Sequence, residues 1–469
     1  MTDLSCDVAI IGAGTAGLAA ERSARAAGAR TLLIDDRFAG TTCATVGCMP
    51  SKLLIAAGHA AHAVRTAPSF GVQVAAPEID GGAVMARVRA QRDSYVAATL
   101  ASIDKIPDGI RQMARARFTD ATRLALDDGR TVSARSVVIA TGSRPRIPEM
   151  YKALGDLVLT NESIFELTDL PVSVAVIGAG PLGLELAQAL ARLGVDTAVF
   201  NRGHHVGGTG DEEVETTLRT ILQKELPIHS GVTLDAEPVA DGARISWSGP
   251  TSGSKVFARV LVATGRAPIM DTLDLAKTGL ALDDHGTPVF DGETMQCGGS
   301  AIFIAGDANA DRSILHEASM EGAIAGRNAA SFPAVEPGKR TPPFSIMFTD
   351  PPLAVIGAPP EEDSVIGEAS YADQGRAKVE GRNAGLVRFY AAPADGRITG
   401  ATLLGPGMDH IGHLIAWAVD RGETATSLLE LPFYHPTFEE GLKSALRSIC
   451  AAVHTPLPRD HENTSPPGG

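Results

Sequence analysis

Two copies of a glycine-rich turn constrain the fold of this 469-residue chain more than any other feature. The first copy, at residues 12–17, follows a short apolar strand and precedes an alanine-rich helix, and the second copy, at residues 178–183, has the same neighbours. Glycines in such a strand–turn–helix unit let the backbone approach a pyrophosphate at the helix N-terminus. The sequence therefore predicts an α/β protein with two Rossmann-like dinucleotide-binding modules. The glycines expected to contact nucleotides are Gly12, Gly14 and Gly17 in the first copy and Gly178, Gly180 and Gly183 in the second.

In each module, the residue at the end of the second strand influences which nucleotide the module binds. In the first module this residue is Asp35, 23 positions after Gly12, where an acid binds ribose hydroxyls. The same offset from Gly178 leads to Asn201, which keeps hydrogen bonding but does not repel a 2′-phosphate, and Arg202 follows it. NAD and NADP therefore both remain candidates for the second module.

Three further strands end in turns that could face a nucleotide. Residues 137–142 and 260–265 repeat the same phrase, a buried strand followed by a tight turn. A strand at 301–305 ends in Gly306 and Asp307, where a carboxylate could hold a ligand hydroxyl or simply cap a turn. The residues assigned to nucleotide binding in the repeated turns are Thr141, Gly142 and Gly265.

A close pair of cysteines, Cys43 and Cys48, lies after the first module's second strand. In an ideal helix their Cα atoms would be roughly 8–9 Å apart, beyond the about 4.4–6.8 Å that a disulfide allows. A bridge between them needs an irregular turn, which Gly47 could supply, and Pro50 fits the first turn of a following helix. Cys48 would then lie near the positive end of that helix, which stabilises a thiolate.

The composition excludes several classes of function. Apolar residues make up 44% of the chain and charged residues 20%, and the length allows two to four domains. The net charge of −14 disfavours nucleic acid or an anionic membrane as a partner. No charge-free apolar run of about 18 residues occurs, and we expect a cytoplasmic protein without a signal peptide.

The cysteine count favours redox chemistry at the close pair. Five cysteines in a chain of this length do not make a structural disulfide framework. A zinc site would need further thiols or histidines at ligand spacing around the pair, and none is present. The remaining alternative is two buried free cysteines.

The last third of the chain differs in composition and carries one more candidate pair. After a linker at Pro342 and Pro343, strands and amphipathic helices are expected, and the helix around 414–419 could form a packing or dimer face. His435 precedes a proline and is therefore held outside the helical region. Glu440 lies five residues later, where it could orient the imidazole or close a helix end.

Eight phrases occur in the order typical of one enzyme family. They are residues 12–17, 43–52, 178–185, 263–266, 304–307, 315–318, 348–351 and 435–440. Through these phrases the chain up to about residue 454 resembles the flavin-dependent pyridine nucleotide–disulfide oxidoreductases, and among them the dihydrolipoamide dehydrogenases most closely.

This resemblance implies a domain order. An FAD-binding domain, residues 1–150 and 271–340, would be split by an inserted NAD(P)-binding domain, residues 151–270. A C-terminal α+β dimerisation domain would occupy 341–454. The tail, 455–469, is rich in proline and polar residues, and we expect it to be disordered.

The resemblance also implies roles for single residues. Cys43 would exchange with the substrate, Cys48 would lie beside the flavin, and Lys52 would lie near the flavin's hydride-accepting nitrogen and pair with Glu185. His435 and Glu440 would act across a homodimer interface on the cysteine pair of the partner subunit, so that a monomer would be inactive. The same likeness adds four residues to the cofactor-binding set: Thr42, Lys52, Asp307 and His316.

The implied reaction is the FAD-dependent oxidation of dihydrolipoamide to lipoamide with NAD or NADP as hydride acceptor. The partner would be a dithiol or disulfide small molecule or a lipoyl arm, and a 2-oxoacid dehydrogenase-type complex could supply that arm. The neutral, apolar residues 431–434 beside His435 favour a lipoyl arm over a carboxylate-bearing disulfide. Two alternatives remain: an NADPH-dependent reductase of another small disulfide, of the glutathione reductase type, and a flavoprotein with a docking or redox-sensing role.

The chain also departs from its relatives. Mercuric and large thioredoxin reductases use an extra C-terminal cysteine pair, whereas Cys450 stands alone here. Thr41 replaces a glycine of the usual Gly-Gly-Thr-Cys phrase and could crowd the flavin phosphate loop. Asn201 and the turn after it, residues 204–208, replace the usual acid and turn of the NAD-preferring members.

Overall fold

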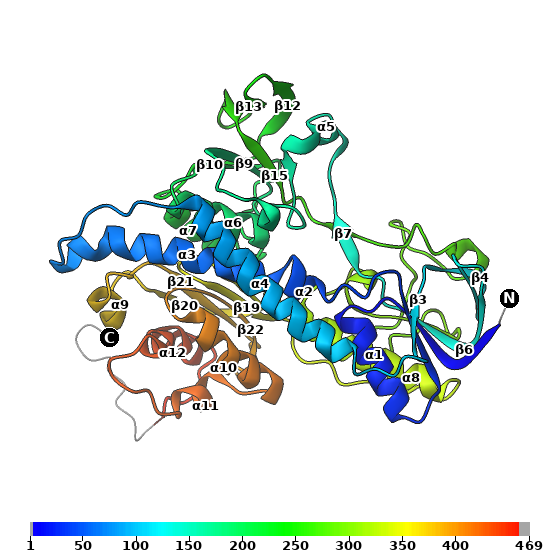
Figure 1. Ribbon diagram of the computed structural model, residues 1–469. Helices are drawn as coiled ribbons and strands as arrows, with labels where there is room; N and C mark the ends of the chain where they lie inside the picture. The colour runs from blue at the N-terminus through cyan, green and yellow to red at the C-terminus, as the bar shows by residue number, and fades with distance from the viewer. Residues whose placement is uncertain (1–2, 459–469) are drawn as a thin grey trace.

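Three β-sheet units with their own helices make up the molecule, which a computed structural model describes for residues 3–458 (Figure 1). The predicted α/β class with a C-terminal α+β unit is confirmed. Among residues 3–458, no helix combines the length and apolar character needed to cross a membrane.

The first sheet has a parallel core with an antiparallel extension. Its order is β3–β2–β1–β6–β5–β4, and β17 pairs with β6. The strands are β1 (Leu4–Ile11), β2 (Thr31–Asp35), β3 (Arg111–Met113), β4 (Ala116–Asp120), β5 (Arg123–Leu126), β6 (Thr131–Ile139) and β17 (Ile302–Ile304). β17 reaches this sheet from far along the chain, as expected if another unit is inserted between β6 and β17.

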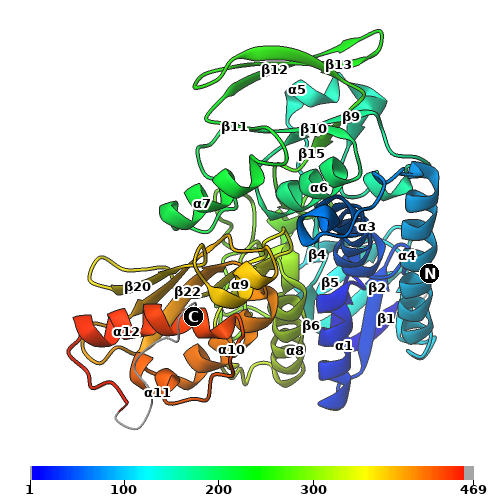
Figure 2. The same cartoon turned by 90° about the vertical axis from the view of Figure 1, so that its left-hand side faces the viewer.

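Helices α1 (Thr15–Ala26) and α8 (Leu315–Ser331) pack side by side against this sheet (Figures 1 and 2). Their backbones approach closely because α8 carries Gly322 and Gly326 at the contact. A Cβ atom on either glycine would collide with the backbone of Ala16 or Ala20 in α1. This contact fixes the helix that follows the first glycine turn.

The second unit repeats the same architecture. Its parallel sheet has the order β11–β10–β9–β15–β8, with β8 (Val158–Leu159), β9 (Ser173–Ile177), β10 (Asp196–Asn201), β11 (Ile228–Ser230) and β15 (Arg259–Val262). All five residues of β9 are buried, as is usual for a strand covered on both faces. The helices are α6 (Pro181–Arg192) and α7 (Glu212–Leu222), and β12 (Thr233–Val239), β13 (Gly242–Ser248) and β14 (Gly253–Phe257) form an antiparallel layer at the top of Figure 1.

Short elements join the second unit to the first. β7 (Ser143–Pro145) and β16 (Arg266–Pro268) pair as an antiparallel ribbon that carries the chain into and out of the second unit. Helix α5 (Glu149–Lys152) follows β7.

A helical arm lies between the units. It contains α2 (Thr42–Thr45), α3 (Cys48–Thr66) and α4 (Gly81–Ile103). Gly58 of α3 sits against the backbone of Ala189 in α6, so α3 packs directly on the second unit (Figure 2). The arm therefore places the cysteine pair at the junction between two nucleotide-binding modules.

The third unit is an antiparallel sheet covered by helices. The order is β18–β19–β22–β21–β20, with β18 (Phe344–Met347), β19 (Leu353–Gly357), β20 (Val365–Ser370), β21 (Leu386–Ala391) and β22 (Ile398–Leu404). Helices α9 (Gly375–Val379), α10 (Met408–Arg421), α11 (Ala425–Leu429) and α12 (Leu442–Ala452) complete it. On α10, Ile411 and Ile415 are buried in this core, whereas Leu414 and Trp417 are exposed.

We propose that the chain divides into domains at the connections between these sheets, near residues 150, 270 and 340. The first residues of the predicted disordered tail are held by Thr426, whose hydroxyl donates to the carbonyl of Pro456. The rest of that predicted tail, residues 459–469, lies outside the described residues.

Candidate active site

The cysteine pair lies at a break between two helices. α2 ends before Gly47, whose φ of −122° and ψ of −116° interrupt the helical path, and α3 begins at Cys48. This is the irregular turn expected at Gly47, and it brings the Cys43 and Cys48 side chains into hydrogen-bond contact. Both cysteines are free thiols in this structure.

The two thiols have opposite pKa shifts. The hydrogen bond from Cys43 and then the charge of Lys52 lower the pKa of Cys48 to about 6. The same hydrogen bond, together with burial, raises the pKa of Cys43. At neutral pH the reduced pair is therefore a thiolate on Cys48 that accepts a hydrogen bond from the Cys43 thiol.

An ion pair joins the cysteine helix to the second unit. Lys52 lies one turn after Cys48 on α3, and its Nζ is 2.8 Å from Oε2 of Glu185 on α6. The Glu185 side chain is only 5% exposed, so its carboxylate is largely shielded from water.

A cavity of about 320 Å³ opens beside this pair. Cys43, Cys48, Lys52 and Glu185 all line it, and so do five of the residues predicted to bind cofactor: Gly14, Thr42, Lys52, Gly142 and Asp307. No atom lies within 4 Å of the position that a Cβ would take on Gly14 or Gly142, so the backbone there is open to a ligand. The cavity begins at the N-terminus of α1, which favours a pyrophosphate, and these features fit FAD.

Other predicted cofactor residues support this cavity without lining it. Gly12 has a φ of +106°, and a Cβ there would collide with the carbonyl of Ala140. The carboxylate of Asp35 accepts hydrogen bonds from the backbone N–H groups of Ala13, Arg37 and Phe38. Asp35 thereby ties the end of β2 to the glycine turn.

Three expected contacts are not seen in the cavity wall. The Thr141 hydroxyl donates to the carbonyl of Ile269, and His316 is exposed, with its ring nearest Phe344. Gly17 packs against the carbonyl of Gly12 rather than facing the cavity.

Thr41 precedes α2 in an extended conformation that any residue adopts, and the cavity lining does not include it.

Sequence reasoning missed two residues of this wall, Asn161 and Arg266, and also Ser143, which hydrogen-bonds to the wall residues Asp307 and Arg266. The Ser143 hydroxyl donates to Asp307 over 2.7 Å and accepts from Nε of Arg266 over 2.8 Å. Asn161 is buried, donates to the carbonyl of Val46 beside the cysteines, and accepts from Arg266. Arg266 belonged to a family phrase that could have pointed to it, but Ser143 and Asn161 stand in no motif or periodic pattern.

The second glycine turn opens into a separate cavity of about 490 Å³. Its lining includes Gly178, Gly180, Asn201, Arg202 and Gly265, and Gly183 packs behind the turn against the carbonyl of Gly178. Among the described residues that line this cavity there are two arginines and no carboxylate. The amide nitrogen of Asn201 donates to the carbonyls of Gly203 and His205, so this side chain also fixes its own turn.

The two cavities share a wall. Four residues line both of them: Asn161, Pro181, Leu182 and Arg266. The two cavities therefore adjoin, and these four residues border both of them.

The histidine pair forms in the third unit. His435 Nδ1 is 2.9 Å from Oε2 of Glu440, which is 4% exposed and also accepts from the Thr437 N–H. Tyr371 and Gln374 anchor the loop by donating to the carbonyls of Phe438 and Thr437. With Nδ1 engaged by the carboxylate, Nε2 is the ring nitrogen that could exchange a proton.

The described lining of the cysteine cavity includes neither His435 nor Glu440. The structure therefore brings together Cys43, Cys48, Lys52 and Glu185 in one group, and His435 with Glu440 in another.

Comparison with known proteins shows the family. The family model described as pyridine nucleotide-disulphide oxidoreductase matches residues 6–323, and the dimerisation domain model of the same family matches residues 344–446. The chain belongs to the pyridine nucleotide-disulphide oxidoreductase family, whose flavoproteins use FAD and NAD(P). Within this family the chain resembles dihydrolipoamide dehydrogenase, and its dimerisation domain indicates a homodimer.

Curated relatives match along nearly the whole chain. A dihydrolipoyl dehydrogenase of Halobacterium salinarum is 28% identical over 469 residues, covering 96% of this chain and 97% of the relative. A mercuric reductase of Streptomyces lividans is 30% identical over 479 residues, covering 95% of this chain and 97% of the relative.

Solved structures share the fold. The HOCl-induced flavoprotein disulfide reductase RclA from Escherichia coli superposes with a TM-score of 0.79 at 20% identity, covering 94% of this chain and 99% of that chain. LpdA from Mycobacterium tuberculosis also reaches 0.79, at 23% identity and 95% and 99% coverage.

Proposed function

We propose that this flavoprotein oxidises dihydrolipoamide to lipoamide and passes the hydride to NAD(P)⁺. The observation that carries the proposal is the hydrogen-bonded pair in which Cys48 is the thiolate and Cys43 the thiol, next to the cavity that fits FAD. The relatives named dihydrolipoyl dehydrogenase support the choice of substrate. Leu431 and Tyr434, which are 55% and 82% exposed beside His435, suit a neutral lipoyl arm.

The proposed reaction begins with the cysteines as a disulfide. His435 of the partner subunit takes a proton from one substrate thiol, and the thiolate attacks the Cys43 sulfur. The Cys43–Cys48 bond breaks, and its electron pair stays on Cys48 as a thiolate that the Lys52 charge stabilises. The second substrate thiol then attacks the mixed disulfide, which closes lipoamide and returns Cys43 as a thiol. Bound FAD would supply the two-electron acceptor that reoxidises the pair and hands a hydride to the nicotinamide.

An activity assay tests this proposal. We expect the purified holoenzyme to reduce NAD⁺ or NADP⁺ with dihydrolipoamide, and Cys43→Ser to lose at least about 10³-fold in kcat because no disulfide can form. Cys297→Ser is a matched control, because Cys297 is buried in another part of the molecule. Full lipoamide turnover by Cys43→Ser would refute the proposal, and failure to reduce either nucleotide would favour the docking role or another disulfide substrate.

A second candidate is an NADPH-dependent reductase of another small disulfide. It is favoured by the nucleotide cavity, whose lining has Asn201 and Arg202 where an acid would repel a 2′-phosphate. Mercuric ion is a weaker candidate as substrate, although one relative is named mercuric reductase. Cys450 stands alone here, whereas mercuric reductases use an extra C-terminal cysteine pair.

Asn201→Asp tests whether this residue determines the preference between NAD(H) and NADP(H). We expect the ratio of kcat/KM for NADP(H) over NAD(H) to fall at least about tenfold in the variant, because the added carboxylate repels a 2′-phosphate. Asn383→Asp adds the same charge in the third unit and should leave the ratio unchanged. An unchanged ratio in Asn201→Asp would mean that this residue does not face the ribose.

A further inference from the structure

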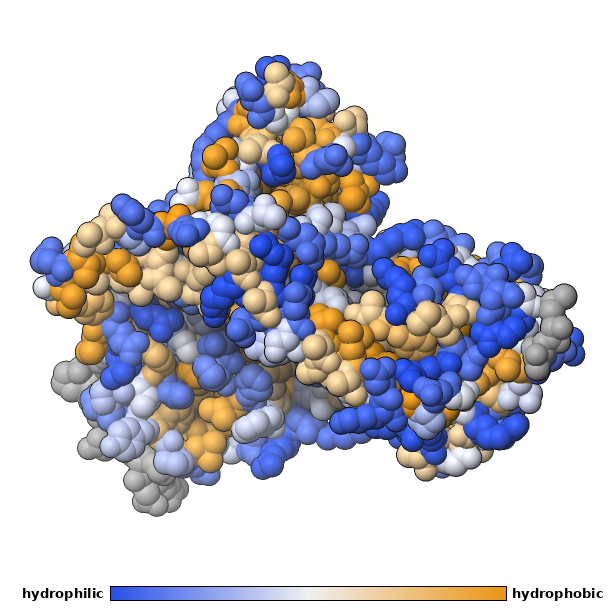
Figure 3. Space-filling view, viewed as in Figure 1, coloured by the Kyte–Doolittle hydropathy of each residue, from blue (hydrophilic) through white to orange (hydrophobic). Residues whose placement is uncertain are grey.

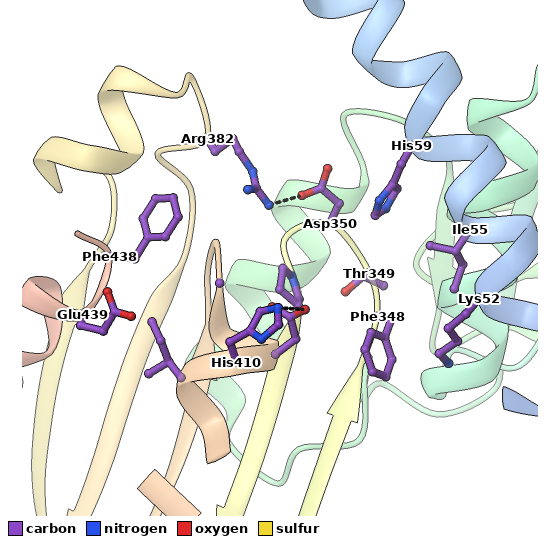
Figure 4. A pocket seen from close by; sticks show the side chains of 14 residues that line it. Lys52, Ile55, His59, Phe348, Thr349, Asp350, Arg382, His410, Phe438 and Glu439 are labelled. Carbon is purple, nitrogen blue, oxygen red and sulfur yellow. Dashed lines mark hydrogen bonds and ion pairs between the residues drawn. The ribbon is translucent and has the colours of Figure 1, made fainter. Parts of the chain in front are cut away.

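A short segment of the third unit reaches the Lys52–Glu185 pair. This segment, Phe348–Asp350, connects β18 to β19, and we call it the strap. The Phe348 N–H donates to Oε1 of Glu185 over 2.8 Å, while the other carboxylate oxygen pairs with Lys52. The Phe348 ring lies 4.4 Å from the Lys52 ammonium, within the range of a cation–π contact. Figure 4 shows the Phe348 and Lys52 side chains next to each other at the edge of a third cavity, which both residues line.

The strap is held in place by α6, the helix that carries Glu185. Gln188 is 3% exposed and forms two hydrogen bonds with Asp350: its amide nitrogen donates to the Asp350 carbonyl, and its oxygen accepts from the Asp350 N–H. Arg192, one turn further on the same face, donates to the Asp350 carboxylate over 2.9 Å. Arg382 approaches that carboxylate from the third unit, as Figure 4 shows.

One face of α6 therefore binds the strap through Gln188 and Arg192 and also carries Glu185. Both oxygens of the Glu185 carboxylate are engaged, one by the strap backbone and one by Lys52. Lys52 is held from two sides, by Glu185 and by the Phe348 ring. A carboxylate fixed at both oxygens and a cation held between two groups leave little freedom for either side chain.

We propose that the strap is a positioning element of the active site, which holds the Lys52 ammonium at the cavity wall beside Cys48. Phe348 and Gln188 are its positioning residues, and neither lines the cavity with the cysteines. The charge of Lys52 favours the Cys48 thiolate, whereas Glu185 opposes it, so the effect on Cys48 depends on where the ammonium is held between them. A looser strap would let Lys52 move toward solvent. The inference goes beyond the proposed substrate, because it concerns the cysteine and flavin side of the site.

The test measures the Cys48 thiolate directly. The holoenzyme is reduced with dithiothreitol, desalted without oxygen and alkylated with iodoacetamide across a pH series, and mass spectrometry follows Cys48 and Cys43 separately. Phe348→Leu keeps the backbone donor but removes the ring, and we expect it to raise the apparent pKa of Cys48 by about 0.5–1 unit. Gln188→Leu removes the two hydrogen bonds to Asp350 at similar side-chain volume, and it should shift the apparent pKa of Cys48 in the same direction. Phe348→Tyr keeps the aromatic face and should return the value to that of the parent.

A matched control separates positioning from stability. Phe290 is also half-buried but packs on the first unit, so Phe290→Leu should lower the thermal midpoint without moving the Cys48 titration. The proposal is overturned if Phe348→Leu and Gln188→Leu titrate like the parent, or if Phe290→Leu shifts the titration as much as they do. Alkylation needs no turnover, so an enzyme inactive with dihydrolipoamide that still shows the shift would refute the proposed substrate and leave the strap intact.

Discussion

Cys48 combines three features that stabilise an anion. It begins α3, it accepts a hydrogen bond from Cys43, and it lies one turn from Lys52. An exposed cysteine titrates near pH 8.5, so a pKa of about 6 keeps Cys48 a thiolate throughout the neutral range. The environment of one side chain thus sets which sulfur of the pair is the anion.

The pH dependence follows from this shift. Because the pKa is lowered, the thiolate should persist down to pH 7 and be lost as the pH falls through about 6. The rate of Cys48 alkylation in the reduced parent enzyme should therefore be half-maximal near pH 6. Cys43→Ala removes the thiol donor, and we expect its half-maximal pH to rise by about one unit. A half-maximal rate above pH 8 in the parent would contradict the interpretation.

At the scale of elements, the sequence was most informative where local chemistry determines local structure. The two glycine turns, the strands before them and the interruption at Gly47 follow from residue types and spacing, and all are present in the structure. Asn161 could not be found in this way, since its partner Val46 is 115 residues away in the sequence. The same holds for the contact between Phe348 and Glu185, which are 163 residues apart and in different units. Contacts of this kind depend on how the units pack, which no local pattern encodes.

The contact between α1 and α8 provides a prediction at this scale. A methyl group on Gly322 would collide with the backbone of Ala16, so Gly322→Ala should lower stability by about 1–3 kcal/mol. Ala16 also lines the cavity that fits FAD, so the flavin-to-protein absorbance ratio should fall as well. Gly109→Ala is a suitable control, because nothing lies within 4 Å of its Cβ position. Equal thermal midpoints for the two variants would show that the helices can separate freely.

At the scale of the molecule, the catalytic groups are divided between two parts of the chain, and the described lining of the cysteine cavity includes neither His435 nor Glu440. The dimerisation domain indicates how they meet, since a second subunit could bring its His435 to the cysteines. Apolar side chains also gather over the outer end of α3 and the loop that follows it (Figure 3), where Phe70 and Val72 are 58% and 55% exposed. Such a surface is typical of an interface.

Mixing two inactive variants tests this arrangement. Cys43→Ser and His435→Ala should each be nearly inactive as homodimers, whereas a heterodimer has one complete site, made of the intact cysteines of one subunit and the intact histidine of the other. Random assembly on co-expression should then restore about a quarter of the parent activity. If His435 instead served the cysteines of its own chain, co-expression would restore nothing.

The wall shared by the two nucleotide cavities has a consequence for electron flow. Asn161, Pro181, Leu182 and Arg266 border both the compartment that contains the sulfurs and the compartment beside the second glycine turn. Reducing equivalents would pass between these adjoining compartments inside the protein, with no diffusible carrier between them. Dioxygen could then intercept these electrons only by entering the protein. We expect a smaller side chain at Leu182 to increase the fraction of electrons lost to dioxygen before it lowers the turnover rate.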